Sequence, residues 1–390
     1  MMRTADPGDD KGQVTAAEVV GRVDDLLARA VQADASDVHF EPTAGELVVK
    51  YRLDGVLNVV DRLPKAVADN VVARLKVLAG LLTYRNDIPQ EGRIEVPPDP
   101  SGKVADQRVA VFPTIHGQRA VVRLFYQNQD LADLGRLGLS PAILGMLQSF
   151  AAGSQGVLLV TGPAGSGKST TLAALLRTIL DRFPGRSIVT LEDPVEIRID
   201  GATQVQISPH AGMTFPVALR SLLRQDPQVL MIGEIRDADT AGIVVEAGLT
   251  GHLLASTMHS GTPAGAIVRL LEMGIEPYQV TSSIWGVVNQ RLVRRLCPDC
   301  KRRTGAGLFE PVGCDRCLGT GFKGRVLIAE AIQLDCALRR AILARADAEE
   351  LQSLVDGRGR GTLAQDGRRL VQEGQTTQDE LAGVIGTAPS

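Results

Sequence analysis

Hydrophobic positions along the chain follow two different patterns, and the change between them falls near residue 140. Before that point, helical and strand patterns are mixed. Val19, Val23 and Leu26 recur at the spacing of an amphipathic helix, whereas residues 47–53 alternate between apolar and polar positions, as a half-buried strand does. Asp54-Gly55 favours a hairpin turn after that strand. This part of the chain is therefore predicted to be a small α+β domain, with helices over 16–31 and 69–82 and strands over 47–53, 56–60, 108–112 and 120–125.

Beyond residue 140, short and continuously apolar runs alternate with helical segments. Strands that are buried on both faces have this pattern, so a parallel sheet covered by helices is expected. The segment from Asp335 onward is predicted to be helical. The predicted strands span 156–160, 187–191, 229–232 and 253–256. The expected organisation is a disordered tail (1–14), an N-terminal domain (15–129), a linker (130–140) and an α/β domain (141–390) that includes a cysteine insertion (296–322).

Composition narrows the function classes. The formal net charge is −3, from 42 Lys+Arg and 45 Asp+Glu among 390 residues, and only 3% of the chain is aromatic. A surface of that kind disfavours nucleic acid as a partner. The apolar runs are far shorter than the roughly 20 residues of a spanning helix, and the polar first residues lack a signal-peptide core. A cytoplasmic protein that reaches the membrane only through partners is expected.

A phosphate-binding loop follows the predicted strand 156–160 and precedes a predicted helix over 171–179. It satisfies G-x-x-x-x-G-K-[ST] in the required strand–loop–helix context. Backbone amides of such a loop cradle phosphates at a helix N-terminus. Lys168 is expected to reach the β- and γ-phosphates of ATP, and the Ser169 hydroxyl to bind Mg²⁺. The predicted nucleotide-binding residues of the loop are Gly162, Pro163, Ala164, Gly165, Ser166, Gly167, Lys168, Ser169 and Thr170.

Two further strands end in carboxylates. Glu234 follows strand 229–232, where a nucleotidase places a group for Mg²⁺ or its water shell, and Glu192 follows strand 187–191, where a base could polarise the attacking water. Both are candidate catalytic residues, and the choice of base between them stays open. Asp193 and Glu196 are interpreted as turn and surface residues.

Four of the five cysteines form two C-x-x-C pairs with thirteen residues between the pairs. In a chain expected in the cytoplasm, this spacing indicates a metal site before it indicates disulfides. Four thiolates give the closed tetrahedral geometry of structural zinc. The predicted zinc ligands are Cys297, Cys300, Cys314 and Cys317, and Cys336 is expected to be a small buried hydrophobe.

An ordered set of motifs resembles the secretion and pilus-assembly ATPases, that is, type II secretion ATPases and type IV pilus extension motors. The resemblance covers roughly residues 19–385. Its motifs are Ser36-Asp37-Val38-His39-Phe40-Glu41-Pro42, Arg52-Leu53-Asp54-Gly55, Glu192-Asp193-Pro194-Val195-Glu196 (aspartate box), Leu223-Arg224-Gln225-Asp226-Pro227 with Gly233-Glu234-Ile235-Arg236-Asp237 (Walker B), Leu249-Thr250-Gly251-His252 with Ser256-Thr257-Met258-His259 (histidine box), Gln290-Arg291-Leu292 and Thr320-Gly321-Phe322-Lys323-Gly324-Arg325.

The resemblance implies a RecA-like P-loop ATPase domain, preceded by a small PAS-like α+β domain and carrying a tetracysteine zinc insertion. It implies a homo-hexamer that binds ATP between subunits and drives assembly of pilin-like subunits against an inner-membrane platform protein. It also implies that two arginines of the first domain act on the phosphates; Arg108 and Arg123 match these positions, and Arg93 and Arg119 are competing candidates nearby. His252 and His259 are implied to sense the nucleotide.

Departures from the family pattern leave alternatives open. Only residues 1–15 precede the first predicted helix, so the family's platform-docking domain is expected to be missing and the docking mode stays open. A pilus retraction motor is one alternative, although such motors generally lack the tetracysteine insertion. A DNA-transfer or translocase ATPase is disfavoured by charge, and an ATP-dependent scaffold by the intact phosphate loop.

Overall fold

A computed structural model describes residues 16–94, 104–126, 133–208, 211–305, 307–358 and 361–386. The expected disordered tail lies outside these residues. The chain divides into two compact units, the first holding the residues up to 127 and the second most of those from 128 onward. Among the described residues, none of the helices has the length and apolar character needed to cross a membrane.

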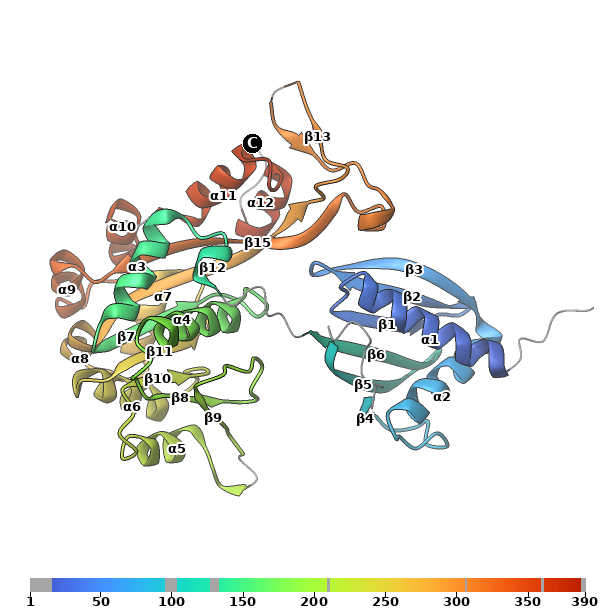
Figure 1. Ribbon diagram of the computed structural model, residues 1–390, viewed down its shortest axis with the longest axis horizontal. Helices are drawn as coiled ribbons and strands as arrows, with labels where there is room; N and C mark the ends of the chain where they lie inside the picture. The colour runs from blue at the N-terminus through green and yellow to red at the C-terminus, as the bar shows by residue number, and fades with distance from the viewer. Residues whose placement is uncertain are drawn as a thin grey trace, which may run out of the picture. The chain divides into compact units, whose positions relative to one another are not determined.

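The first unit is a six-stranded antiparallel sheet in the order β3-β2-β1-β6-β5-β4. Its two long helices pack against each other and on one face of the sheet (Figure 1). Its elements are α1 (Ala16–Gln32), β1 (Asp37–Pro42), β2 (Glu46–Leu53), β3 (Val56–Pro64), the short 3-10 turn Lys65–Val67, α2 (Ala68–Leu78), β4 (Gln90–Ile94), β5 (Val104–Thr114) and β6 (Gly117–Tyr126).

Alternation along β2 determines which face of this sheet is covered. Leu47, Val49 and Tyr51 are buried toward the helices, as predicted, and the Tyr51 hydroxyl donates to the carbonyl of Leu26 on α1 at 2.5 Å. The predicted turn between β2 and β3 is present, with Asp54 and Gly55 both at positive φ. The opposite face of the sheet is then free to carry polar side chains.

The second unit contains a seven-stranded sheet in the order β15-β12-β7-β11-β10-β8-β9. Neighbouring strands from β12 to β9 run parallel, and β15 is antiparallel to β12. Its elements are α3 (Pro141–Ala152), β7 (Gly156–Thr161), α4 (Lys168–Arg182), β8 (Ile188–Glu192), β9 (Thr203–Gln206), α5 (Phe215–Leu222), β10 (Val229–Ile232), α6 (Ala238–Leu249), β11 (Leu253–Met258), α7 (Pro263–Glu272), α8 (Pro277–Ser283), β12 (Ile284–Leu296), β13 (Arg302–Arg303), β14 (Phe309–Glu310), β15 (Phe322–Gln333), α9 (Cys336–Leu343), α10 (Ala348–Arg358), α11 (Leu363–Gln372) and α12 (Gln378–Ile385).

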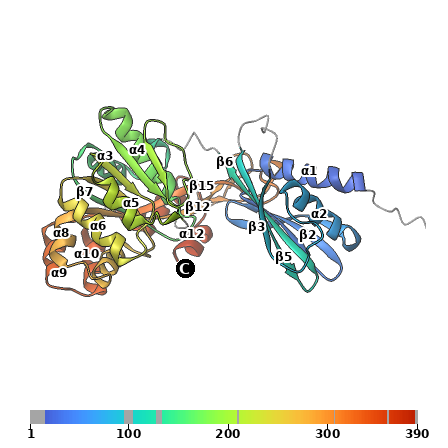
Figure 2. The same cartoon turned by 90° about the horizontal axis from the view of Figure 1, so that it is seen from below.

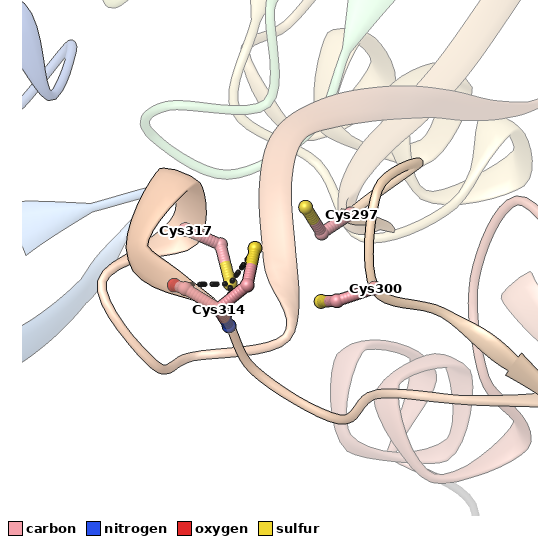
Figure 3. Close-up of side chains that lie close together, drawn as sticks. All are labelled: Cys297, Cys300, Cys314 and Cys317. Carbon is pink, nitrogen blue, oxygen red and sulfur yellow. Dashed lines mark hydrogen bonds between the residues drawn. The ribbon is translucent and has the colours of Figure 1, made fainter.

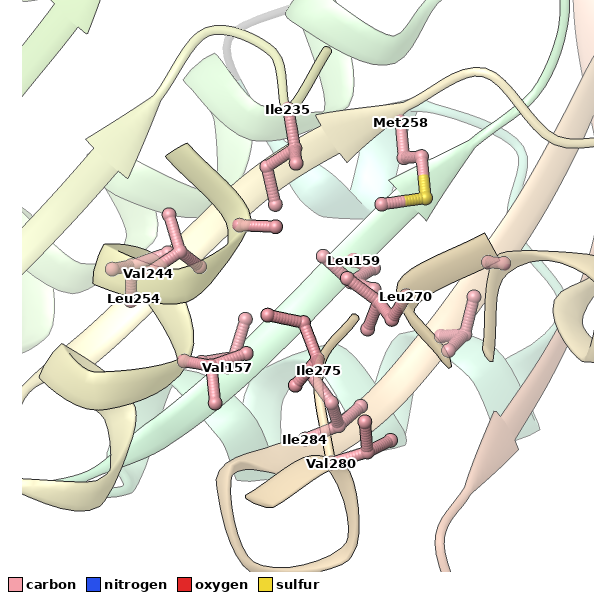
Figure 4. Packing of buried hydrophobic residues seen from close by; sticks show 14 of the residues in the cluster. Val157, Leu159, Ile235, Val244, Leu254, Met258, Leu270, Ile275, Val280 and Ile284 are labelled. Carbon is pink, nitrogen blue, oxygen red and sulfur yellow. The ribbon is translucent and has the colours of Figure 1, made fainter. Parts of the chain in front are cut away.

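Strand β7 shows why this sheet is covered on both faces. Val157 and Leu159 join the core that contains α6, α7 and α8, whereas Leu158 and Val160 join the core beneath α3 and α4. Figure 4 shows the first core, and Figures 1 and 2 show helices on each side of the sheet. The prediction of a parallel sheet flanked by helices is confirmed.

Two local expectations differ from the structure. Leu134, Leu137 and Leu139, placed by sequence in a linker, are buried in the core beneath α3 and α4. Because their side chains are apolar, this stretch packs within the second unit and is not an exposed linker. Cys336, expected to be buried, is exposed as the first residue of α9, because the neighbouring Leu338 occupies the inward position of that helix.

Candidate nucleotide site

The phosphate loop lies where the sequence predicts it, between the buried strand β7 and helix α4. Gly162 begins the loop with a φ of 143°, and a Cβ there would lie 2.5 Å from the carbonyl oxygen of Gln290. Gly167 precedes α4 at a φ of 87°. Such conformations strongly favour glycine, so the motif's glycines have a physical cause in the loop's shape.

Two features of the loop fit a phosphate group. Lys168 Nζ donates to the carbonyls of Gly162 at 3.0 Å and Pro163 at 2.9 Å, so the ammonium group lies over the loop. Burial lowers the pKa of Lys168, and the carboxylates of Glu234 and Glu196 oppose that shift. Among the described residues, the buried Ser166 hydroxyl has no hydrogen-bond partner. Ser169, the predicted Mg²⁺ ligand, is exposed in the first turn of α4.

Both candidate catalytic carboxylates lie at the edge of the sheet from which the phosphate loop emerges. Strands β8 and β10 are parallel neighbours, with Leu191 opposite Ile232, so their carboxyl ends meet. Glu192 is buried, and its Oε1 accepts hydrogen bonds from Thr190 Oγ1 at 2.7 Å and Gln204 Nε2 at 3.0 Å. One oxygen of Glu192 is thereby engaged by two neutral donors.

Glu234 is contacted by a histidine and an arginine instead. His259 Nε2 lies 2.8 Å from its Oε1, and Arg236 Nε lies 2.5 Å from its Oε2. His259 reaches this position because it follows β11, which lies beside β10 in the sheet. The structure therefore brings together Glu234 and His259, two residues that are 25 positions apart in the sequence.

His252 is placed differently from His259. It precedes β11, at the strand end opposite the phosphate loop, because Leu253 pairs with Gly156 and Met258 with Thr161. Six strand residues separate the two histidines, about 20 Å of extended chain. His252 Nδ1 lies 3.1 Å from the carbonyl oxygen of Ala247 at the end of α6. Within this unit His252 is not brought to the phosphate loop, and its nucleotide contact remains only an implication of the resemblance.

The first unit displays a row of charged side chains across its sheet. Cross-strand pairing places Arg52 opposite Asp37, Asp37 opposite Arg123, Arg123 opposite Arg108 and Arg108 opposite Arg93. The side chains of Arg108 and Arg123 are 58% and 65% exposed. Such a row is suited to binding an anion.

Asp37 orients one arginine of this row. Arg123 Nε donates to Asp37 Oδ1 at 3.0 Å, and Arg52 Nε lies 3.2 Å from Oδ2. Burial raises the pKa of Asp37, but the hydrogen bonds from Arg123 and Ser36 and the two arginine charges outweigh it, so the pKa lies below its ordinary value. Asp37 therefore stays ionised and fixes the Arg123 guanidinium by its Nε.

The four predicted zinc ligands converge in the segment between β12 and β15. Their sulfur atoms all lie within 4.8 Å of one another, and Figure 3 shows the four side chains facing a common centre. In a tetrahedral site with Zn–S bonds of about 2.3 Å, the sulfurs are roughly 3.8 Å apart, so this set fits zinc. The amides of Gly313 and Cys314 donate to Cys300 Sγ and Cys317 Sγ at 3.3 and 3.2 Å.

Some site residues were not identified from sequence. Gln204 on β9 holds Glu192, and Gln290 on β12 contacts the phosphate loop. Gln290 belongs to a motif that the resemblance includes, but its contact depends on β12 lying beside β7 in the sheet. No sequence pattern indicates Gln204, because the short polar strand β9 lacks the apolar residues by which a buried strand is predicted.

A phosphate loop at the carboxyl edge of a parallel sheet, with carboxylates at the same edge, is the arrangement of the P-loop nucleoside triphosphatases. A family model described as "Type II/IV secretion system protein" matches residues 13–383. The chain belongs to this family of secretion ATPases.

Named relatives agree with this membership. The chain is 41% identical over 368 residues to the type II secretion system protein HxcR of Pseudomonas aeruginosa, covering 94% of this chain and 77% of that protein. It is 39% identical over 378 residues to the type IV pilus assembly ATPase PilB of Thermus thermophilus, covering 92% of this chain and 42% of PilB. The chain thus spans less than half of PilB and about three quarters of HxcR.

Solved structures share the fold. The ATPase DotB of Legionella pneumophila superimposes with a TM-score of 0.68 at 21% identity, covering 96% of both chains. The pilus retraction motor PilT, solved with bound ADP, superimposes with a TM-score of 0.59 at 24% identity, covering 94% of this chain and 96% of PilT.

Proposed function

We propose that this chain is an ATP-hydrolysing motor that powers assembly of pilin-like subunits, for type II secretion or type IV pilus extension. The observation that carries the proposal is the phosphate loop with Lys168 over it and the Glu234–His259 pair at the same sheet edge. The names of the relatives favour assembly over retraction or DNA transfer.

In this proposal Lys168 binds the β- and γ-phosphates of ATP. The Ser166 hydroxyl, which has no partner within the described part of the chain, is available to an incoming oxygen. Ser169 would hold Mg²⁺, which neutralises charge as the phosphoryl group transfers. Glu234 or Glu192 orients the attacking water, and His259 links the state of the γ-phosphate to Glu234.

The proposed assembly is a homo-hexamer in the cytoplasm, bound to the inner membrane through a platform protein. Arg108 and Arg123 would act on ATP held by another subunit. The four-cysteine cluster would bind one structural zinc, because its four sulfurs leave no ligand position for water.

The test replaces the lysine of the phosphate loop. Lys168→Ala should abolish ATP turnover in a folded protein, because the phosphates lose the positive charge of the loop. Phosphate release is measured together with circular dichroism. Arg182→Ala, which removes an exposed charge from the last turn of the same helix, is the matched control and should stay active. Wild-type turnover by folded Lys168→Ala would refute the nucleotide-site assignment.

A further inference from the structure

Three consecutive residues of β12 contact two loops that the proposed reaction needs. Asn289, Gln290 and Arg291 lie beside the end of β7, where Asn289 pairs with Thr161 in the sheet. Asn289 and Gln290 are fully buried, although both are polar. Buried amide side chains are retained at little cost only where their hydrogen bonds are made. The partners of these side chains therefore indicate what the segment does.

Gln290 makes hydrogen bonds to the phosphate loop and to the helix that follows it. Its Nε2 donates to the carbonyl oxygen of Ser166 at 2.9 Å, and its Oε1 accepts from Thr171 Oγ1 at 3.1 Å. One partner lies in the loop and the other in the first turn of α4. The backbone oxygen of Gln290 lies 2.5 Å from where a Cβ on Gly162 would be. The end of the loop is thus held by hydrogen bonds to this residue, and the start of the loop lies against its backbone.

Asn289 and Arg291, on either side of Gln290, make hydrogen bonds to the loop that follows His259. The carbonyl oxygen of Gly261 accepts from Asn289 Nδ2 at 2.7 Å and from Arg291 Nη2 at 3.0 Å. Arg291 Nη1 also donates to Asn289 Oδ1 at 2.9 Å, which joins the two side chains. Because Gly261 is two residues after His259, the two hydrogen bonds to the Gly261 carbonyl limit where His259 lies beside Glu234.

Glu330 of β15 supports Asn289 from the neighbouring strand. Its Oε1 accepts from Asn289 Nδ2 at 2.7 Å, and its Oε2 accepts from the amide of Leu363 at the start of α11 at 3.2 Å. The Asn289 amide group is consequently satisfied on every side. It cannot turn without breaking a buried hydrogen bond, so the segment is a rigid support and not an adaptable one.

We propose that Asn289, Gln290 and Arg291 are positioning residues that hold the phosphate loop and the His259 loop in a fixed relation during ATP hydrolysis. Gln290 acts on nucleotide binding, because it shapes the loop that binds phosphate. Asn289 and Arg291 act on the chemical step, because they place His259 and, through it, Glu234. This inference rests on the proposed ATPase function.

The first experiment tests Gln290. Gln290→Met keeps the length of the side chain and removes both hydrogen bonds, so affinities for ADP and ATP should each fall roughly fivefold to tenfold. Binding is measured by titration with each nucleotide. Val293→Ala removes packing from a fully buried position of the same strand, in a core away from the loop, and should leave nucleotide affinity unchanged. Wild-type affinity in Gln290→Met would overturn the role of Gln290.

A second variant covers the case in which Gln290→Met does not fold. Thr171→Val removes only the hydroxyl that Gln290 Oε1 accepts from, whereas Thr171→Ser keeps it. The valine variant should bind ADP about threefold to fivefold more weakly, and the serine variant should bind as the wild type does. Equal affinities in these two variants would contradict the proposal.

The third experiment separates chemistry from binding. Arg291→Met should lower kcat about tenfold or more, while the dissociation constant for ADP changes less than twofold. A general loss of structure would change both together. An unchanged kcat, or an ADP affinity as weak as that of Gln290→Met, would contradict the role of Arg291.

The two levels of failure are distinguishable. If the wild-type chain neither binds nor hydrolyses ATP, the proposed function fails. If the wild type is active and Lys168→Ala is dead, but Gln290→Met and Arg291→Met match the wild type, only the positioning role fails.

Discussion

Glu330 is a carboxylate with almost no access to solvent, and its two oxygens accept hydrogen bonds from Asn289 and Leu363. Burial raises the pKa of Glu330 above its ordinary value, although these hydrogen bonds and the charge of Arg291 oppose the shift. The folded chain therefore binds this proton more tightly than the unfolded chain does. The contribution of such a group to the free energy of unfolding is greatest below the pKa that the group has in the unfolded chain. This contribution is lost as the pH rises through the pKa that the group has in the folded chain.

We therefore expect the stability of Glu330→Gln to depend less on pH than that of the wild type. Thermal midpoints are measured from the ordinary glutamate value of 4.5 upward. As pH rises, the wild-type midpoint should fall relative to that of the variant, because only the wild type must ionise a buried acid. Glu349→Gln, at an exposed position of α10, should show no such change. Parallel curves for the wild type and Glu330→Gln would contradict the raised pKa.

At the scale of single residues, sequence predicts what is local. The phosphate loop and the two C-x-x-C pairs are contiguous motifs, so their geometry follows from spacing. The pairing of His259 with Glu234 depends on β10 and β11 being neighbours, and the contact of Gln290 with Ser166 depends on β12 lying beside β7. Strand order is not encoded in either local pattern. The motifs nonetheless indicate Glu234 and His259, whereas Gln290 is indicated only by the resemblance to the family.

At the scale of elements, the apolar runs predicted the central strands well. The predicted strand 229–232 has the bounds of β10, and the predicted strand 187–191 is one residue from β8. Two of the strands that the apolar pattern does not predict carry buried polar residues. β1 contains Asp37 and His39, and β12 contains Asn289 and Gln290. Their polar side chains interrupt the apolar pattern because they make hydrogen bonds inside the fold.

The cysteine insertion and the adjoining end of β12 are tied to the C-terminal helices by backbone and side-chain hydrogen bonds. Leu296 N donates to the carbonyl of Gln375 at 2.8 Å, and Lys301 Nζ donates to that of Gly374 at 2.7 Å, just before α12. Arg294 reaches Glu380 on α12 at 2.6 Å. A substitution of these cysteines is therefore expected to destabilise the packing of these helices. The phosphate loop contacts β12 at Gln290, before the cysteine insertion, and is expected to keep its hydrogen bonds.

Cys297→Ser should lower the melting temperature and leave nucleotide affinity unchanged. Protein purified without chelator should contain about one zinc per chain, and the variant should contain less. For a unit of this size, each kcal/mol lost lowers the midpoint by roughly 2–4 °C. Cys336→Ser, at the exposed cysteine outside the cluster, is the matched control. Metal-free protein of full stability would contradict a zinc site.

At the scale of the whole molecule, the candidate catalytic groups are divided between two compact units. Arg108 and Arg123 lie on the first unit's sheet, and the phosphate loop lies in the second unit. In the proposed hexamer, the arginines of one subunit serve ATP held by another. Arginines of this kind stabilise charge that develops on the transferring phosphoryl, and their loss costs more in turnover than in ground-state binding.

Arg108→Ala and Arg123→Ala should each lower kcat by roughly a thousandfold, with a smaller effect on ATP affinity. Arg62→Ala removes an exposed arginine from the same sheet and should keep wild-type turnover, because Arg62 pairs with Glu46 away from the charged row. Wild-type activity should also rise faster than linearly with protein concentration if sites form only on assembly. A fully active Arg123→Ala would remove that residue from the mechanism.

Mixing two inactive variants tests whether the site is shared between subunits. Arg123→Ala subunits keep an intact phosphate loop, and Lys168→Ala subunits keep an intact arginine row. In a mixed oligomer some sites combine the intact loop of the first with the intact arginine of the second, so part of the activity should return. If each site drew both groups from one subunit, every site would stay defective, and mixing would restore nothing. Oligomers with confirmed subunit exchange that remain as inactive as either parent would therefore contradict catalysis between subunits.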